Sequence, residues 1–102
     1  MYLKDLIERL EKHPREQVAL RGFHEPHSHR ANYADLAFEP TENITVGEMQ
    51  DAANSAHGAT FTGYKGGDYT MGDYTDVFIA NYGCCGDGIS SMLLDYMLGE
   101  PK

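Results

Sequence analysis

The sequence predicts an α+β domain in which about three helices are packed on one side of a small, mostly antiparallel β-sheet. Three segments carry apolar residues at helical spacing, and the runs between them are short and bounded by turn-forming residues. The expected order is helix, strand, strand, helix, strand, strand, helix. A chain of 102 residues is the size of one domain with one core, so we expect a single domain over residues 1–102.

The first helix is expected from Leu3 to the step before Pro14. Its apolar side chains recur at i, i+3, i+4 and i+7 and form one stripe: Leu3, Leu6, Ile7 and Leu10. The helix should end there because the residue before a proline is pushed out of the helical region. Residues 17–20 then form a short apolar run that we interpret as a strand, and Gly22 begins a loop that contains three histidines.

The second helix has the clearest sequence signals. It follows a short strand at residues 36–39, which we expect to close at Pro40. Thr45 and Glu48 have the spacing of a capping box, in which each residue satisfies a backbone N–H of the other. Gly58 is suited to the residue that ends the helix.

The second half of the chain predicts two strands and a last helix. We expect strands at residues 59–64 and 75–82, joined by a segment in which residues 67–70 are repeated at 72–75. A period of five residues is too short for a solenoid, so the repeat indicates turn residues along a hairpin. Apolar residues at helical spacing over 89–97 predict the third helix, and a glycine and a proline follow it as stop signals.

Composition limits the classes of function. A net charge of −8 opposes nonspecific binding to nucleic acid, which needs a surplus of Lys and Arg to replace counterions on phosphates. No apolar run is long enough to cross a bilayer, and the N-terminal segment has no signal-peptide core, so we expect a soluble, cytoplasmic protein without membrane contact. The two cysteines are adjacent, Cys84 and Cys85, which fits a reducing compartment better than a disulfide.

Three histidines near the middle of the first half raise the possibility of a metal site. Neutral imidazoles are common zinc ligands, and the candidates are His24, His27 and His29. His24 and His27 would share a face only on a helix, and Pro26 lies between them. We therefore expect no metal and no cofactor. Other chemistry stays open at this point: phosphoester cleavage by His27 and His29, a reactive cysteine before the last helix, or carboxylates that imitate nucleic acid.

A site for an anion is the alternative that uses the most residues. Hydrogen-bond donors come from Arg21, His27, Ser28 and Arg30. The segment Lys65, Gly66 and Gly67 adds a cation and glycines that let backbone N–H groups approach a ligand. Tyr33 and Tyr69 offer aromatic faces on which a base can stack. The competing interpretation pairs the arginines with nearby carboxylates, treats residues 65–67 as a hairpin turn and places the tyrosines in half-buried strands.

Much of the chain resembles a family of small, mostly uncharacterised proteins of tailed bacteriophages. The resemblance covers Arg21–Pro40, Thr45–Met49 and Gly58–Gly67, with a Pro-His-Ser-x-Arg core, a Leu-Ala-Phe-Glu-Pro strand and a Thr-Gly-x-Lys-Gly-Gly loop. The core matches Pro26, His27, Ser28 and Arg30. His24 and His29 lie outside the pattern.

The phage resemblance brings an analogy of size and setting with proteins that sequester nucleotide immune signals. It implies a phage-encoded binding protein that holds a phosphate-bearing small molecule, such as a cyclic nucleotide or a cyclic ADP-ribose isomer, in a homo-oligomer. Such a protein needs tight binding and no catalysis. The alternatives are an acidic inhibitor that binds a host enzyme, and a small phosphoesterase that cleaves such nucleotides.

Overall fold

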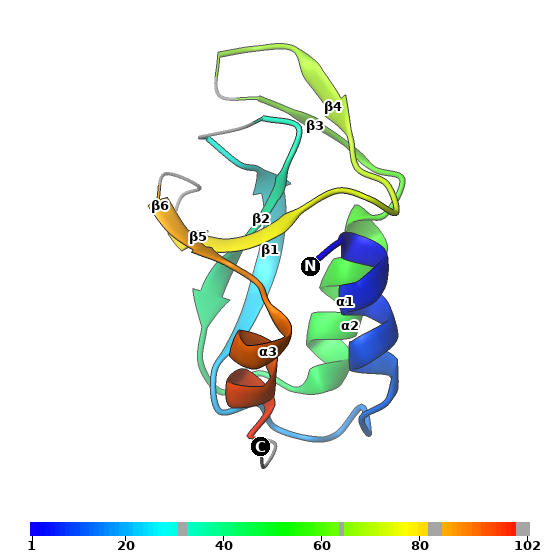
Figure 1. Ribbon diagram of the computed structural model, residues 1–102, viewed down its shortest axis with the longest axis vertical. Helices are drawn as coiled ribbons and strands as arrows, with labels where there is room; N and C mark the ends of the chain where they lie inside the picture. Colours follow the sequence, from blue (N-terminus) through cyan, green and yellow to red (C-terminus); the bar gives the residue numbers. More distant parts are fainter. Residues whose placement is uncertain (31–32, 64, 82–84, 100–102) are drawn as a thin grey trace.

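The fold is α+β, as predicted (Figure 1). The computed structural model describes residues 1–30, 33–63, 65–81 and 85–99. The helices of this part are α1 (Leu3–Glu11), α2 (Val46–Ala56) and α3 (Ser91–Leu98). The strands are β1 (Gly22–Ser28), β2 (Leu36–Thr41), β3 (Thr60–Thr62), β4 (Asp68–Thr70), β5 (Val77–Asn81) and β6 (Cys85–Gly88).

Four of the strands form one mixed sheet, in the order β1-β2-β5-β6. The outer pairs, β1 with β2 and β5 with β6, are antiparallel, whereas β2 and β5 are parallel. Parallel neighbours need a long connection, and here it consists of α2 and a separate hairpin of β3 and β4. Figure 1 shows this hairpin beyond one end of the sheet, beside the connection between β1 and β2.

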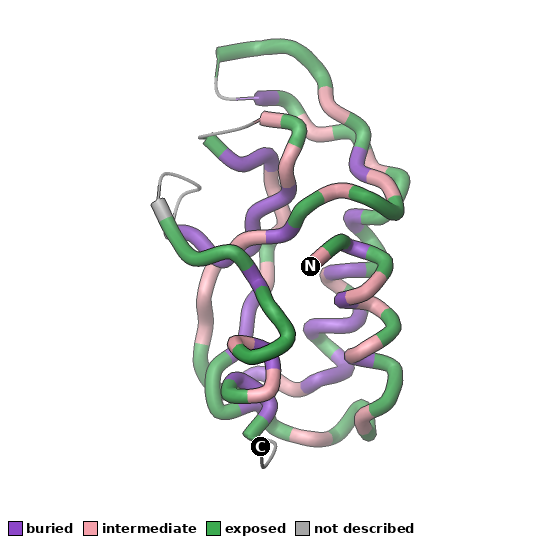
Figure 2. Tube along the Cα trace, in the orientation of Figure 1, coloured by how far each residue is buried: buried purple, intermediate pink, exposed green. Residues whose placement is uncertain are grey.

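The core lies between the sheet and the helices. Phe23 and Phe38 meet within it, with ring centroids 4.4 Å apart, and both are fully buried. The strand register places β2 and β5 side chains on this inner face together with the apolar stripes of the helices: Leu36, Val77, Ile79, Leu3, Leu6, Leu10, Met49, Ala53, Leu94 and Met97. Figure 2 shows the buried positions along β1 and β2 and on α1 and α2, which flank this core.

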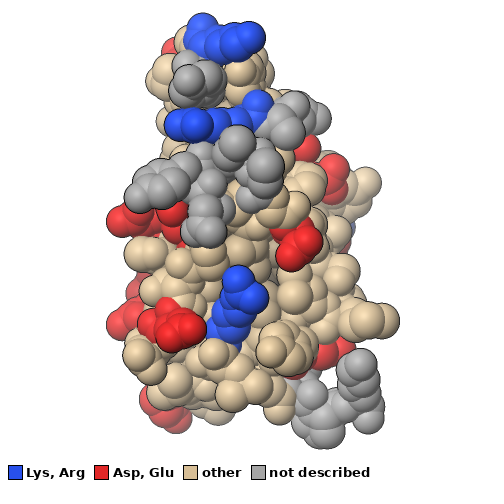
Figure 3. All heavy atoms as spheres, turned by 90° about the vertical axis from the view of Figure 1, so that its left-hand side faces the viewer, with Lys and Arg blue, Asp and Glu red and all other residues tan. Residues whose placement is uncertain are grey.

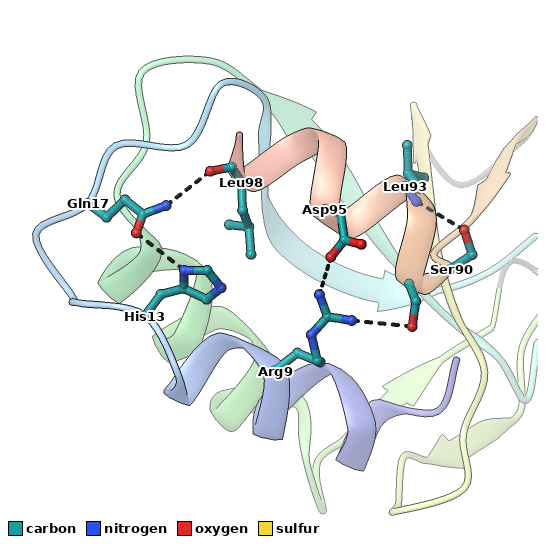
Figure 4. A network of polar contacts seen from close by, with 8 residues as sticks. Arg9, His13, Gln17, Ser90, Leu93, Asp95 and Leu98 are labelled. Carbon is teal, nitrogen blue, oxygen red and sulfur yellow. Dashed lines mark hydrogen bonds and ion pairs between the residues drawn. The ribbon is translucent and has the colours of Figure 1, made fainter. Parts of the chain in front are cut away.

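Helix α3 is held against the N-terminal part of the chain by polar contacts (Figure 4). The Arg9 guanidinium forms an ion pair with Asp95 and donates to Ser91 Oγ at 3.2 Å. Gln17 Nε2 donates to the carbonyl of Leu98 at 3.0 Å. These contacts join α3 to α1 and to the segment after it, so α3 covers the same side of the sheet as the other helices.

The predicted helix ends agree with the structure. Thr45 Oγ1 accepts from the Glu48 backbone N–H at 3.2 Å, which is one half of the expected capping box. Gly58 follows α2 with φ +80°, and Gly99 ends α3 with φ +73°, in the left-handed region that favours glycine. The start of α3 differs slightly, because Ser90 caps it and accepts from the Leu93 N–H at 3.1 Å.

The strand predicted at residues 36–39 is confirmed as part of β2, but the predictions for residues 17–20 and for the histidine segment were wrong. The histidine segment is β1, not a loop, and residues 17–20 form only an isolated bridge between Val18 and Thr45. Pro26 is tolerated in β1 because this is an edge strand, where one side of the backbone needs no ladder partner. A bulge at Glu25, with φ +44°, accommodates the irregular register between His24 and Pro26. Strand β2 also continues through Pro40 to Thr41.

The second half of the chain contains two strands that were not predicted, β4 and β6. The expected strand at 59–64 is reduced to β3, which pairs with β4, so the first half of the five-residue repeat forms a hairpin strand. The second half of the repeat lies outside the strands. The glycine-rich segment β6 pairs with β5, and a Cβ on Gly86 would lie 1.9 Å from the carbonyl oxygen of Ile79. Cys84 lies outside the described residues, and so does the end of the strand predicted at 75–82.

Candidate functional site

The residues predicted to bind an anion lie at two places in the structure. Arg30 and Tyr33 belong to the connection between β1 and β2, and Lys65, Gly66, Gly67 and Tyr69 belong to the β3–β4 hairpin. We call these six residues the hairpin site. Arg21 precedes the opposite end of β1. At about 3.3 Å per residue, a seven-residue strand separates its ends by roughly 20 Å. Arg21 therefore does not join the hairpin site.

Two tyrosines connect the halves of the hairpin site. The rings of Tyr33 and Tyr69 have centroids 5.8 Å apart and planes inclined by 60°. Gly63 permits this approach, since a Cβ there would lie 3.0 Å from Tyr69 Cε2 and 3.1 Å from Tyr33 Cγ. Gly63 was not among the predicted site residues, although it is the glycine of the Thr-Gly-x-Lys-Gly-Gly loop that the resemblance had marked.

The turn of the hairpin confirms the alternative interpretation of residues 65–67. The Gly63 N–H donates to the Gly67 carbonyl and the Gly66 N–H donates to the Gly63 carbonyl, both at 2.9 Å. Gly66 and Gly67 have φ of +93° and +84°, which side chains rarely adopt. Within the described ranges, the backbone N–H groups of Lys65 and Gly67 make no hydrogen bond to the protein. They remain available to a ligand.

Charge is distributed unevenly over the molecule. Figure 3 shows Lys and Arg side chains together at the hairpin end, while acidic side chains lie mainly below them on the same face. The two segments of the hairpin site contribute Arg30 and Lys65, both exposed. Asp68 is the nearby acidic residue in β4, and its carboxylate accepts from Thr62 Oγ1 at 3.3 Å. The hairpin site thus presents two exposed basic side chains in a chain of net charge −8.

Ser28 and His27 have structural contacts that leave little for a ligand. Ser28 is buried, and its Oγ donates to the Tyr33 carbonyl at 2.6 Å. His27 Nδ1 lies 3.2 Å from the Ser28 carbonyl, which can only accept, so Nδ1 carries the proton. Nε2 of the same ring is buried and lies 3.7 Å from Glu39 Oε2. The two residues shape the connection that holds Tyr33 instead of pointing donors at the hairpin turn.

The histidines lie differently from what their spacing predicted. The bulge at Glu25 adds one residue between His24 and His27, so both share the sheet face that carries Glu39, opposite the helices. The prediction that they could share a face only on a helix was wrong. Among the residues that the structure describes, no three His, Cys, Asp or Glu side chains are placed to hold one metal ion.

His29 is buried at the start of the β1–β2 connection. Its ring lies against Phe78, with centroids 4.5 Å apart, and its backbone N–H donates to the Asp35 carbonyl at 2.9 Å. Burial lowers the pKa of His29, and the charge of Asp35 acts in the opposite direction. Burial also raises the pKa of Asp35, with a smaller contribution from Asp76. The connection therefore contains two titratable groups whose charged forms are disfavoured.

Comparison with known proteins gives no relative from which a function could be transferred. No protein-family model matches the chain, and no curated protein or solved structure matches it either. The resemblance to phage proteins stays a prediction. In the described part of the chain, no helix has the length and apolar character needed to cross a membrane.

Proposed function

We propose that the protein binds a phosphate-bearing small molecule at the hairpin site and sequesters it. The observation that carries the proposal is the contact between Tyr33 and Tyr69, 5.8 Å apart. It joins two segments that are distant in sequence, each of which brings an exposed basic residue. The hairpin site therefore combines an aromatic pair, two basic side chains and a glycine turn at one end of an acidic protein.

Each group at the hairpin site has a role in this proposal. Arg30 and Lys65 neutralise phosphate charge, and an arginine fork matches two phosphate oxygens. The free N–H groups of Lys65 and Gly67 donate to the remaining oxygens, as backbone nests do for anions. The half-buried Tyr33 and Tyr69 offer ring faces to a base. A nucleotide satisfies all three requirements, and a cyclic nucleotide or cyclic ADP-ribose isomer made by a host against phage is the expected class.

Binding without turnover is supported by His27, which the phosphoesterase alternative would need as acid or base. Its Nδ1 is held by the Ser28 carbonyl, and its Nε2 is buried beside Glu39. A general acid or base must reach the proton that it transfers. Sequestration requires only affinity, so it uses the groups that the hairpin site exposes.

The test is a titration of the purified chain with cyclic dinucleotides, cyclic ADP-ribose isomers, ATP and inorganic phosphate, followed by calorimetry. Lys65→Gln should weaken nucleotide binding about tenfold or more, because it removes one charge-assisted contact. Tyr69→Leu should weaken nucleotides but leave inorganic phosphate unchanged. Matched controls are Lys12→Gln and Tyr96→Leu, which remove the same side-chain types outside the hairpin site. The proposal fails if no phosphate compound binds, or if Lys65→Gln binds like the parent.

A sequestering protein gains affinity when subunits enclose the ligand, and we therefore propose a homo-oligomer. Light scattering after size exclusion measures its mass directly. A monomer at all concentrations, with and without the nucleotide that binds, would contradict this part of the proposal and leave the binding site itself in place.

A further inference from the structure

A second candidate site lies at the opposite end of β1, around Arg21. Two hollows of about 130 Å³ and about 380 Å³ adjoin there and share Arg21 and Pro40 in their linings. The smaller hollow is also lined by Asp87 and by apolar side chains, among them Ile79, Leu93 and Met97. The smaller hollow is thus lined by one basic side chain, one acidic side chain and several apolar side chains.

The fold accounts for this arrangement. The Arg21 backbone N–H donates to the Met97 carbonyl at 3.3 Å, which fixes Arg21 beside α3. Leu93 and Met97 are four residues apart on α3 and so share one face of the helix. Asp87 pairs with Ile79 in the β5–β6 register, so it lies on the sheet face that α3 covers. The close approach at Gly86 brings β6 near enough for Asp87 to line the hollow.

Within the described residues, neither charged side chain of the smaller hollow has an ion pair. Among the described residues, the Arg21 guanidinium makes no ion pair or side-chain hydrogen bond, and the Asp87 carboxylate makes none. By contrast, Arg9 pairs with Asp95 and Arg15 pairs with Asp51. Arg21 and Asp87 line one hollow without pairing with each other, which leaves room between them for a ligand with both charges.

We propose that the smaller hollow binds a free aliphatic α-amino acid. Arg21 binds the carboxylate through its guanidinium fork, and Asp87 accepts from the ammonium group. Ile79, Leu93 and Met97 contact the aliphatic side chain and remove it from water. At about 30 Å³ per water molecule, the volume holds about four waters, which suits a side chain of the size of leucine.

A purely anionic ligand fits this place less well than a zwitterion. Asp87 lines the smaller hollow and Glu42 lines the larger one, so each hollow holds a carboxylate near Arg21. A second negative charge would be repelled by these groups, whereas an ammonium group is attracted. The carboxylates that would repel a phosphate therefore attract the ammonium group of a zwitterion. The proposal does not depend on the proposed function of the hairpin site.

The experiment is calorimetric titration of the full chain with L-leucine and with two analogues that each lack one charge, 3-methylbutylamine and 4-methylpentanoate. Leucine should bind at least about tenfold more tightly than either analogue, because each lacks one charge-assisted contact. Arg21→Gln should weaken leucine and 4-methylpentanoate but not the amine. Asp87→Asn should weaken leucine and the amine but not 4-methylpentanoate. Lys12→Gln, which lines neither hollow, should bind leucine like the parent.

Several outcomes would overturn the proposal. They are no binding of leucine, equal binding of leucine and one analogue, or unchanged leucine binding in Arg21→Gln. Thermal unfolding monitored by circular dichroism shows whether each variant is folded before it is titrated. Nucleotide binding by Arg21→Gln provides a separate readout, which should stay at the parental level because Arg21 lies outside the hairpin site.

Discussion

The buried hydroxyl of Ser28 donates a 2.6 Å hydrogen bond to the carbonyl of Tyr33. This bond connects the last residue of β1 to the tyrosine that meets Tyr69. The Pro-His-Ser-x-Arg segment therefore holds the shape of the connection that carries Tyr33, and in the proposed function Ser28 acts through Tyr33 and not on the ligand itself.

Replacing Ser28 by alanine should destabilise the protein by about 1–2 kcal/mol, because the hydrogen bond from the buried Ser28 hydroxyl to the Tyr33 carbonyl is lost. It should also weaken nucleotide binding at the hairpin site, since Tyr33 loses its anchor. Urea unfolding and calorimetry measure the two effects. Ser55→Ala is the matched control: Ser55 is exposed, donates to the Ala52 carbonyl within its own helix, and should change stability by less than about 0.5 kcal/mol.

Gly86→Ala should be among the most damaging substitutions of a glycine in this chain. The new methyl group would lie 1.9 Å from the Ile79 carbonyl oxygen and 2.7 Å from Ala80 Cα, both backbone atoms that cannot swing away. A cost of about 3 kcal/mol or more is expected from such overpacking. Gly72→Ala is the control, because a Cβ there meets nothing within 4 Å. Equal urea midpoints for the two variants would contradict the β5–β6 register.

Asp95→Asn should cost more stability than Asp51→Asn. The Arg9–Asp95 pair is partly buried, with side chains 24% and 32% exposed, whereas Arg15 and Asp51 are 58% and 66% exposed. Loss of the partly buried contact should cost about 1–3 kcal/mol, and loss of the exposed one should cost much less because solvent screens that pair. Urea unfolding at low and high salt measures both, and the exposed pair should be the more sensitive to salt.

Stability should fall when the pH is lowered through the range in which His29 titrates. Burial lowers its pKa from the ordinary value of 6.5, so below pH 6.5 the unfolded chain binds the proton more readily than the folded protein. The loss therefore begins near pH 6.5 and continues down to the folded pKa. His29→Phe keeps a ring against Phe78 and removes this dependence. The stability of this variant relative to the parent should rise between pH 7 and pH 5, as measured by urea unfolding at each pH.

The raised pKa of Asp35 acts with the opposite sign. Above its ordinary value of 3.8, the folded protein holds the Asp35 proton more tightly than the unfolded chain, so stability falls as the pH rises through the folded pKa. Because His29 also lowers the pKa of Asp35, His29→Phe is compared with the parent in chains that both carry Asp35→Asn, which removes this contribution. No change in their difference between pH 7 and pH 5 would contradict the burial of His29.

The sequence predicted the helices because their signals are local. The stripe of Leu3, Leu6 and Leu10 faces the core, and the cap at Thr45 lies where the capping box placed it. Such signals depend on spacing within a few turns, and no distant residue has to be known. The same holds for Gly99, whose left-handed φ of +73° ends α3.

The strands were harder to predict because their partners decide them. The middle of β1 consists of residues that do not favour a strand, His24, Glu25 and Pro26, so its extended shape depends on pairing with β2. The wrong prediction of a loop in place of β1 also misplaced Arg21 relative to the other site residues. A loop could have folded Arg21 back toward Arg30, but an extended strand keeps the ends of the segment apart. The sequence named the residues of the hairpin site but not their arrangement, because the contact of Tyr33 with Tyr69 forms between segments that only the fold brings together.

The bulge at Glu25 also sets the phase of the whole strand. In a regular strand, Phe23 and Ser28 would point to opposite faces, because they are an odd number of residues apart. Here Phe23 pairs with Pro40 and Ser28 with Leu36, two positions on the same face of β2, so both side chains point to the core. The inserted residue thus lets side chains near both ends of β1 point into the same core. Its removal would turn the side chains at one end of β1 to the opposite face of the sheet.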